Sequence, residues 1–423
     1  MRHLIIGAGP AGVVAAEQLR ELDPEGSVTL LGDEPEPPYS RMAIPYLLMG
    51  NIGEAGTHLR KDPAHYDKLR IEVLQERVTA IDPAAHKVKL GGGGTRPYDK
   101  LLIATGASPI EPPIPGIDRD GVHACWTLAD ARKIAARAHK GSRVVLVGAG
   151  FIGCIILESL ARRGVDLQVV EIEDHMVPRM LNPTAAGMIR RWCEQHGVSV
   201  RVSTRVEAIE AGADGHPLSV LLSGGDRLPA DLVIRATGVR SNTGFLEGSG
   251  IATDRGVLVD EFLATSVPDV YAAGDAAESL DFSTGQRVVQ AIQPTAVEHG
   301  RVAAMHMVRG HGHPQQGTLN MNVLDTLGLV SSSFASWMGV DGGDSAELQD
   351  AGNFRYLNLQ FRDDVLVGAT ALGLTDHVGV LRGLIQSRTR LGHWKKKLQA
   401  DPSQLVQAYL ATTLPVGHNA YVI

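Results

Sequence analysis

The sequence is poor in cysteine and in aromatic residues, and it has no long apolar run. Only three of its 423 residues are cysteines, Cys125, Cys154 and Cys193, and these are odd in number and far apart. This pattern excludes a disulfide scaffold and fits a reducing compartment. No window approaches eighteen uninterrupted apolar residues, so no membrane span is expected. The N-terminus enters a strand pattern directly, without the regions of a signal peptide, so we expect a cytoplasmic protein.

The charge balance does not favour a nucleic-acid partner. The sequence has 40 basic and 47 acidic residues, a net charge of −7, and no long basic run interleaved with aromatics. Binding to nucleic acid is therefore not expected. Glycine is in excess instead: 48 residues, or about 11% against roughly 7% in average proteins. This excess predicts places where the backbone turns tightly or approaches a ligand closely.

One strand–glycine–helix unit occurs twice in the sequence. Residues 3–14 read HLIIGAGPAGVV and residues 143–154 read RVVLVGAGFIGC. The similarity continues downstream, where KLLIATGASP at 100–109 matches DLVIRATGVR at 231–240. In a G-x-G-x-x-G motif the first glycine permits a tight turn, the second lets the backbone approach a pyrophosphate, and the third lets the helix pack on the strand. Two dinucleotide-binding units are implied.

Short apolar runs alternate with segments of helical periodicity. We expect strands at 3–6, 28–31, 101–104, 144–147, 167–170, 232–234 and 270–272. Helices are expected at 12–22, 128–139, 152–163 and 184–196. This alternation predicts an α/β protein with two Rossmann-like, doubly wound domains.

Changes in composition suggest where the domains begin and end. A Pro-rich stretch at 109–116 and the segment SNTG at 241–244 are candidate boundaries, and two strand-like runs flank a turn at 362–364. We expect an α+β interface domain at the C-terminal end. The predicted domains are 1–112 with 244–320, an inserted second domain at 113–243, and a C-terminal domain at 321–423.

An acidic residue after the second motif indicates which dinucleotide binds there. Glu171 follows Gly148 by 23 positions, near the spacing of about 20 typical of a carboxylate that holds the ribose hydroxyls. Glu173 and Asp174 come next. A 2′-phosphate would meet like charge here, so NADH is favoured over NADPH. For the first motif the ribose carboxylate is Asp33 or Glu34, and the sequence leaves this choice open.

Five motifs in order resemble one known family. GAGPAG, LLIATGASP, GAGFIG, ATGVRSNT and TSVPDVYAAGDAAE are similar to the two-dinucleotide flavoproteins, the pyridine nucleotide-disulfide oxidoreductases, over nearly the whole chain. The resemblance implies FAD in the first Rossmann unit and NAD(P)H in the inserted one. In that family the C-terminal domain forms the dimer interface, so a homodimer is expected.

The resemblance also implies roles for single residues. Asp275, beside Gly274, would bind the FAD ribitol or pyrophosphate, Arg41 of a PYSR segment would contact FAD, and Val78 the adenine. A helix that starts at Pro294 would point its positive end at the flavin. The residues expected at FAD are Gly7, Gly9, Pro10, Gly12, Asp33, Glu34, Arg41, Val78, Thr105, Gly106, Gly274, Asp275, Pro294 and Thr295. Those expected at NAD are Gly148, Gly150, Ile152, Gly153, Glu171 and Gly238.

The chain departs from the family where other members carry out disulfide chemistry. Met42 stands where disulfide-reducing members have a redox cysteine, and a thioether cannot form a thiolate. Disulfide reduction at this position is therefore excluded, and we expect the three cysteines to be small buried hydrophobes. Tyr46 and Ile155 replace a Lys and a Glu of the ferredoxin-type reductases, which argues against close kinship with that branch.

Without a redox cysteine at position 42, the reaction that remains possible is hydride transfer from NADH C4 to flavin N5. Tyr46, next to Pro45, is the candidate residue over the isoalloxazine or at the nicotinamide entrance, with core packing as the alternative. His299 and His306 are candidate proton donors, but a surface or interface position is the simpler interpretation. No metal site is expected, because the histidines near residue 312 have no third ligand.

The electron acceptor stays open. We expect an FAD-dependent NADH oxidoreductase that passes electrons to a protein carrier of the ferredoxin or rubredoxin type. The alternatives are an NADH oxidase or peroxide reductase acting on a small oxidant, and a non-catalytic, redox-sensing FAD/NAD-binding protein. Arg390 and Lys395–Lys397, around Trp394, form a basic cluster that could dock an acidic carrier or be a solvated helix face.

Overall fold

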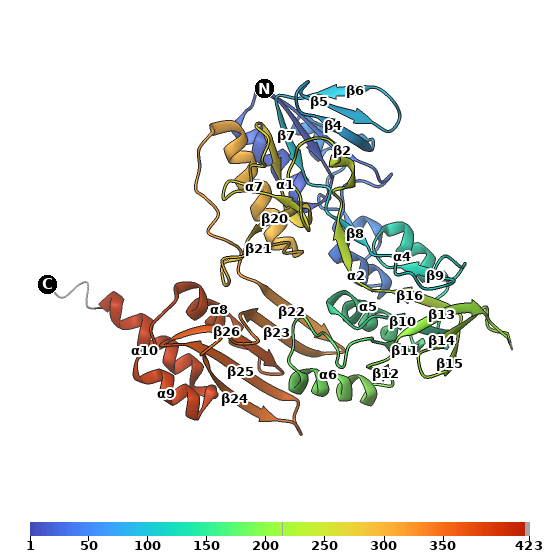
Figure 1. The fold of residues 1–423 in the computed structure, drawn as a ribbon, viewed down its shortest axis with the longest axis vertical. Coiled ribbons are helices and arrows are strands. Elements are labelled where there is room, and N and C mark those ends of the chain that lie inside the picture. Colours follow the sequence, from blue (N-terminus) through green and yellow to red (C-terminus); the bar gives the residue numbers. More distant parts are fainter. Residues whose placement is uncertain (214, 419–423) are drawn as a thin grey trace. The chain divides into compact units, whose positions relative to one another are not determined.

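The computed structural model describes residues 1–213 and 215–418 and divides into two units (Figure 1). Unit 1 consists of Met1–Ile110, Trp126–Leu128 and Val239–Thr318. Unit 2 consists of Glu111–Cys125, Ala129–Gly238 and the chain from Leu319 onward. The expected α/β fold is confirmed, whereas the division into three domains stays a prediction.

Unit 1 is built on a parallel sheet with the strand order β19-β7-β1-β2-β3. Its strands are β1 (Arg2–Ile6), β2 (Ser27–Gly32), β3 (Ile71–Gln75), β7 (Lys100–Ile103) and β19 (Val270–Ala272). The four strands expected here are confirmed. β3 was not expected, because it is an edge strand whose residues are mostly exposed and lack a continuous apolar run.

Helices α1 (Pro10–Leu22) and α7 (Gln293–Arg309) pack against each other in unit 1 (Figure 1). Their approach is close, because a Cβ at Gly300 would lie 2.4 Å from the carbonyl oxygen of Ala11. The remaining elements of unit 1 are β4 (Val78–Asp82), β5 (Lys87–Leu90), β6 (Thr95–Pro97), β8 (Ala107–Pro109), β17 (Val239–Ser241), β18 (Val257–Leu258), β20 (Ala277–Leu280), β21 (Arg287–Val288), α2 (Ile44–Leu48) and α3 (His65–Lys68), with short 3₁₀ turns at Arg41–Ala43, Glu54–Thr57, Gly244–Leu246 and Gly274–Ala276.

Unit 2 contains a second parallel sheet, with the order β12-β11-β10-β16-β9. Its strands are β9 (Val122–Ala124), β10 (Arg143–Val147), β11 (Asp166–Val170), β12 (Ser199–Arg201) and β16 (Leu232–Arg235), and its helices are α4 (Leu128–Ala135, whose first residue belongs to unit 1), α5 (Phe151–Arg162) and α6 (Pro183–Gln195). An antiparallel sheet of β13 (Val206–Ala211), β14 (Leu218–Leu222) and β15 (Arg227–Ala230) adjoins it. The expected strands and helices are confirmed, although α4 ends before residue 139.

The rest of unit 2 is an antiparallel sheet with the order β22-β23-β26-β25-β24. Its strands are β22 (Met321–Thr326), β23 (Leu329–Ala335), β24 (Asp344–Asp350), β25 (Arg355–Arg362) and β26 (Val365–Leu372), followed by α8 (Val378–Ser387), α9 (His393–Ala400), a 3₁₀ turn at Pro402–Gln404 and α10 (Leu405–His418). The predicted turn at 362–364 joins β25 to β26. A hydrogen bond joins the start of helix α6 to this sheet: Nδ2 of Asn182, the residue before α6, donates to the buried hydroxyl of Tyr356 on β25 at 2.6 Å.

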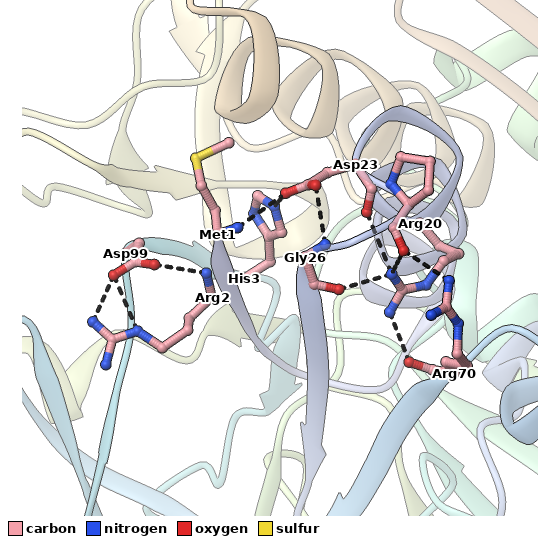
Figure 2. A network of polar contacts seen from close by, with 9 residues as sticks. Met1, Arg2, His3, Arg20, Asp23, Gly26, Arg70 and Asp99 are labelled. Carbon is pink, nitrogen blue, oxygen red and sulfur yellow. Dashed lines mark hydrogen bonds and ion pairs between the residues drawn. The ribbon is translucent and has the colours of Figure 1, made fainter.

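One arginine closes the first strand–helix–strand unit of unit 1 (Figure 2). The Arg20 guanidinium, near the end of α1, donates hydrogen bonds to carbonyl oxygens in the loop between α1 and β2 and in the approach to β3. These acceptors are the carbonyls of Asp23, Pro24, Gly26, Leu69 and Arg70, at 2.7 to 3.3 Å. A single planar donor therefore satisfies carbonyl groups left over at a helix end.

Replacement of Arg20 by methionine is expected to lower the free energy of unfolding of the apoprotein by about 2–3 kcal/mol, because several carbonyls lose a charged donor. Urea unfolding measures the loss. Arg2→Met is the matched control. The Arg2 guanidinium bonds to Asp99, and both side chains are exposed, so this change should have a much smaller effect, because solvent screens the ion pair. Equal effects of the two substitutions would contradict the role given to Arg20.

Candidate functional site

The predicted FAD residues that follow strands of unit 1 lie at one edge of its parallel sheet. Gly7 follows β1, Asp33 follows β2, Thr105 follows β7 and Gly274 follows β19. In parallel α/β sheets ligands bind at the carboxyl ends of the strands. The other predicted FAD residues belong to the same unit, and the predicted NAD residues all belong to unit 2.

The three glycines of the first motif differ in what the fold requires of them. Gly7 has φ +115°, and a Cβ there would lie 2.0 Å from the Ala104 carbonyl oxygen. A Cβ at Gly12 would lie 1.9 Å from the Gly7 carbonyl oxygen. Gly9 has an ordinary φ of −81°, and a Cβ there would meet no protein atom within 4 Å. The fold therefore needs glycine at the first and third positions, while a bare backbone at Gly9, just before α1, fits a pyrophosphate.

The second motif repeats this pattern in unit 2. A Cβ would lie 2.5 Å from the Ala236 carbonyl oxygen at Gly148, and 2.1 Å from the Gly148 carbonyl oxygen at Gly153. Gly150 has φ −71°, and a Cβ there would meet no protein atom within 4 Å. Ile152 lies in the first turn of α5, and Gly238 (φ +99°) lies beyond the end of β16. The same local sterics thus support a second dinucleotide cradle.

Glu171 directly follows β11 and is buried, with 5% of its surface exposed. Its Oε2 accepts a hydrogen bond from the Ala149 backbone N–H at 2.5 Å, and its Oε1 accepts one from the Glu173 N–H at 2.9 Å. The carboxylate therefore holds the glycine loop itself. Each oxygen keeps further acceptor capacity, so its predicted contact with the ribose hydroxyls stays a prediction.

Asp33 and Glu34, the two candidates for the FAD ribose, have different surroundings in the structure. Glu34 Oε1 accepts from Arg41 Nη2 at 2.6 Å, and Oε2 accepts from the Tyr39 hydroxyl at 2.5 Å. The Asp33 side chain is 55% exposed, and its ion-pair partner Arg77 lies at 3.9 Å. Both oxygens of Glu34 are engaged within the protein but keep further acceptor capacity, as those of Glu171 do, so the choice between Asp33 and Glu34 for the FAD ribose stays open.

Arg41 is held by groups that the sequence did not connect to it. Besides Glu34, its guanidinium donates to the Trp126 carbonyl oxygen at 2.8 Å. It also lies over the Tyr39 ring at 5.6 Å and over the Trp126 ring at 5.4 Å, as cation–π contacts. Trp126 is 85 positions away in the chain, so local sequence carries no signal for this contact.

Asp275 follows Gly274, which has φ +68° and would bring a Cβ to 3.2 Å from the Ala11 side chain. Burial raises the pKa of the Asp275 carboxyl to about 6, and the nearby Arg41 charge offsets part of that rise. A desolvated carboxylate in such a place is poised to accept hydrogen bonds from hydroxyl groups. Of the two predicted contacts, the FAD ribitol carries such hydroxyls and the pyrophosphate does not, and the role of Asp275 stays a prediction.

Two further polar groups border this edge of unit 1. Thr105 Oγ1 donates to the Asn242 carbonyl oxygen at 3.0 Å, and Asn242 Nδ2 donates to the Thr105 carbonyl oxygen at 2.9 Å. Thr295 lies in the first turn of α7 beside Pro294, and its buried hydroxyl has no hydrogen-bond partner within the described residues. A buried hydroxyl at a helix N-terminus fits a polar ligand group.

Other predicted site residues lie elsewhere in unit 1. Val78 is buried in the main hydrophobic core, on β4. Pro45 and Tyr46 lie on α2, where the Tyr46 side chain is 53% exposed, and Met42 on the preceding turn is 48% exposed. Core packing does not account for Tyr46. Its role at the nicotinamide entrance stays a prediction.

The three cysteines are free and buried, as expected. Burial raises the pKa of the thiols of Cys125 and Cys193 to about 12, so neither is a thiolate near neutral pH.

The interpretation of His299 as a surface or interface residue is wrong. It is 1% exposed, because its ring lies against the segment from Gly274 to Ser279.

The basic cluster is partly engaged within unit 2. Lys395 forms an ion pair with Asp344 and lies over the Phe361 ring at 5.9 Å. Lys397 lies 4.0 Å from the centre of the Trp394 ring. Docking of a carrier by this cluster stays a prediction.

Neither a metal cluster nor a membrane-spanning helix occurs in the part of the chain that the structure describes. Within residues 1–213 and 215–418, no group of three or more His, Cys, Asp or Glu side chains is placed to hold a metal ion. Over the same residues, no helix has the length and hydropathy to cross a membrane.

Comparison with known proteins identifies the class to which this fold and these two cradles belong. Residues 1–300 match the pyridine nucleotide-disulphide oxidoreductases, and the chain belongs to this family. FAD and NAD(H) are the cofactors of the family, and the protein is an FAD-dependent NADH oxidoreductase.

Particular relatives differ in how much of the chain they share. The chain is 31% identical to the NADH-dependent phenylglyoxylate dehydrogenase subunit epsilon of Aromatoleum evansii, over 97% of this chain and 98% of that one. It is 34% identical to the biphenyl dioxygenase system ferredoxin–NAD(+) reductase component of Paraburkholderia xenovorans, over 72% of this chain and 74% of that one. The structure of a NAD-dependent persulfide reductase from A. fulgidus matches with a TM-score of 0.84 and 28% identity, over 93% of this chain and 78% of that one.

Proposed function

We propose that this protein takes electrons from NADH through FAD and delivers them to an iron–sulfur protein, bound as a partner subunit or met as a small carrier. The full-length similarity to the epsilon subunit of an NADH-dependent dehydrogenase carries this proposal. A match over 97% of the chain includes most of residues 321–423, the region from which partner choice is expected to come. The ferredoxin reductase component, with 72% coverage, supports the same acceptor class.

The residues of the chain supply binding and alignment. FAD, when bound, accepts a hydride from NADH and passes its electrons on. Gly9 and Gly150 let two helix N-termini approach the two pyrophosphates, and the Asp275 carboxylate holds hydroxyls of the FAD ribitol. The N-terminus of α7 places its positive dipole end near the flavin, which favours negative charge there.

Met42 removes one competing function. A thioether at this position cannot exchange disulfides, so electrons must leave the flavin directly.

We further infer a homodimer formed through residues 321–423, a cytoplasmic location, and the three domains with the boundaries given above.

Anaerobic titration of the flavin-loaded protein tests the proposal. NADH is expected to bleach the flavin absorbance at concentrations about tenfold or more below those of NADPH, because Glu171, Glu173 and Asp174 repel a 2′-phosphate. The NADH-reduced protein should then be reoxidised by a ferredoxin about tenfold or more faster than by oxygen or peroxide.

Other outcomes support the alternatives. Faster reoxidation by oxygen or peroxide would establish an oxidase or peroxide reductase and overturn the acceptor assignment. A flavin that NADH does not bleach would indicate a non-catalytic, redox-sensing binding protein. Reduction of coenzyme A disulfide would contradict the argument from Met42.

A further inference from the structure

His299 lies inside unit 1, against the turn that carries Asp275. It lies on α7 and is 1% exposed. Its Nδ1 accepts a hydrogen bond from the Gly274 backbone N–H at 3.2 Å, and its Nε2 lies 3.3 Å from the Ser279 hydroxyl oxygen. A backbone N–H can only donate, so Nδ1 must be the unprotonated nitrogen. The imidazole proton therefore sits on Nε2 and is donated to Ser279.

The same turn is held from two other directions. The Ser241 hydroxyl donates to the Asp275 carbonyl oxygen at 2.6 Å. At Gly274 a Cβ would lie 3.2 Å from the Ala11 side chain and 3.3 Å from the Ala296 side chain, so α1 and α7 flank the turn. The Ala273–Gly274 and Asp275–Ala276 peptide groups, which flank the Gly274–Asp275 peptide, are thus both held by hydrogen bonds.

We infer that His299 is a positioning residue for the flavin site, which as a neutral imidazole fixes the Gly274 amide and so the direction of the Asp275 carboxylate. This inference rests on the proposed role of Asp275 in binding FAD. His299 acts through the turn, and the group that would meet the cofactor is the carboxylate.

The chemistry of the site distinguishes this positioning role from two simpler roles for His299, that of a proton donor and that of a side chain that only fills the core. A proton donor must ionise, but burial lowers the pKa of His299 to about 4, so the ring is neutral at physiological pH. A residue that only fills the core would need no nitrogen. An apolar side chain of similar size would leave the buried Gly274 N–H and the Ser279 hydroxyl without their present partner.

The test compares substitutions that keep or remove the acceptor. His299→Leu fills the space without an acceptor. His299→Asn places an amide oxygen near the position of Nδ1, where it can accept from Gly274, whereas the longer amide of His299→Gln reaches toward the position of Nε2. His306→Leu is the control on the same helix, because His306 bonds to the Tyr271 hydroxyl and stacks on Phe262 instead of touching the turn.

Two quantities are measured for each variant. The first is the affinity of the apoprotein for added FAD, and the second is the midpoint potential of the bound flavin. The leucine variant is expected to bind FAD at least tenfold more weakly, the asparagine variant within about threefold of the original protein, and the His306 control unchanged. The potential should shift in the leucine variant and return in the asparagine variant. Should the leucine variant fail to fold, asparagine is expected to exceed glutamine in FAD affinity. Equal affinity of these two variants, or an unchanged affinity of the leucine variant, overturns the inference.

The Asp275→Asn variant tests the proposed role of Asp275 in FAD binding separately from the inference about His299. If Asp275→Asn leaves FAD affinity unchanged, the proposed role of Asp275 fails, and the role of His299 fails with it. If it weakens FAD binding but His299→Leu does not, only the inference about His299 fails. In the double variant the two effects are expected to be less than additive, since both act on one carboxylate.

Discussion

Replacing Gly9 by alanine is expected to weaken FAD binding strongly while leaving the stability of the apoprotein unchanged. Gly9 has a φ open to any residue, and its added methyl would meet no protein atom within 4 Å. A methyl pushed against a closely held pyrophosphate costs roughly 1–3 kcal/mol, as overpacking does. That corresponds to a loss of about 5- to 150-fold in affinity. By the same argument, Gly150→Ala is expected to weaken NADH binding without releasing FAD.

The neighbouring glycines provide matched controls for this prediction. Gly12→Ala and Gly153→Ala would place a methyl 1.9 Å and 2.1 Å from a carbonyl oxygen. Both should therefore lower the melting temperature of the apoprotein, which Gly9→Ala and Gly150→Ala should not. Calorimetry on the apoproteins and fluorescence titration with FAD or NADH separate the two effects. If the Gly9→Ala protein bound FAD with normal affinity, the first glycine motif (Gly7, Gly9 and Gly12) would not be part of the FAD site.

Asparagine in place of Asp275 is expected to stabilise the apoprotein at pH 7 and to weaken FAD binding. The folded-state pKa of this carboxyl, about 6, lies above its ordinary value of 3.8. The folded protein therefore binds more protons than the unfolded chain between these values, and stability from this group is lost as the pH rises through about 6. The loss amounts to at most about 3 kcal/mol, and an uncharged amide does not incur it.

The pH dependence identifies the cause. The gain in unfolding free energy of Asp275→Asn over the original protein should be near zero at pH 4 and should reach its full size above pH 7. FAD affinity should fall by roughly 10- to 150-fold, as expected for losing a charged acceptor. Urea unfolding at several pH values and FAD titration measure both quantities. A stability difference that is the same at pH 4 and pH 7 would show that burial of the charge is not its origin.

The sequence by itself determined most strands of the two parallel sheets and the two glycine motifs, and its resemblance to a known family indicated that Met42 replaces a redox cysteine. These follow from local rules. A short apolar run in front of G-x-G-x-x-G can form little else than a buried strand and a helix start, and the steric need for glycine at Gly7 and Gly12 arises where the strand, the turn and the helix meet. Such signals can be read from a short window of the sequence.

Only the tertiary structure decided which polar groups meet. It engaged Glu34 with Arg41, in a cluster completed by Trp126 from 85 positions away. It enclosed His299 beside Gly274, 25 positions away, and paired Lys395 with Asp344, 51 positions away. Periodicity shows which face of an element is apolar, but not which element packs against it. The partner of a buried polar group is set by that packing, because the group must be satisfied wherever the fold encloses it.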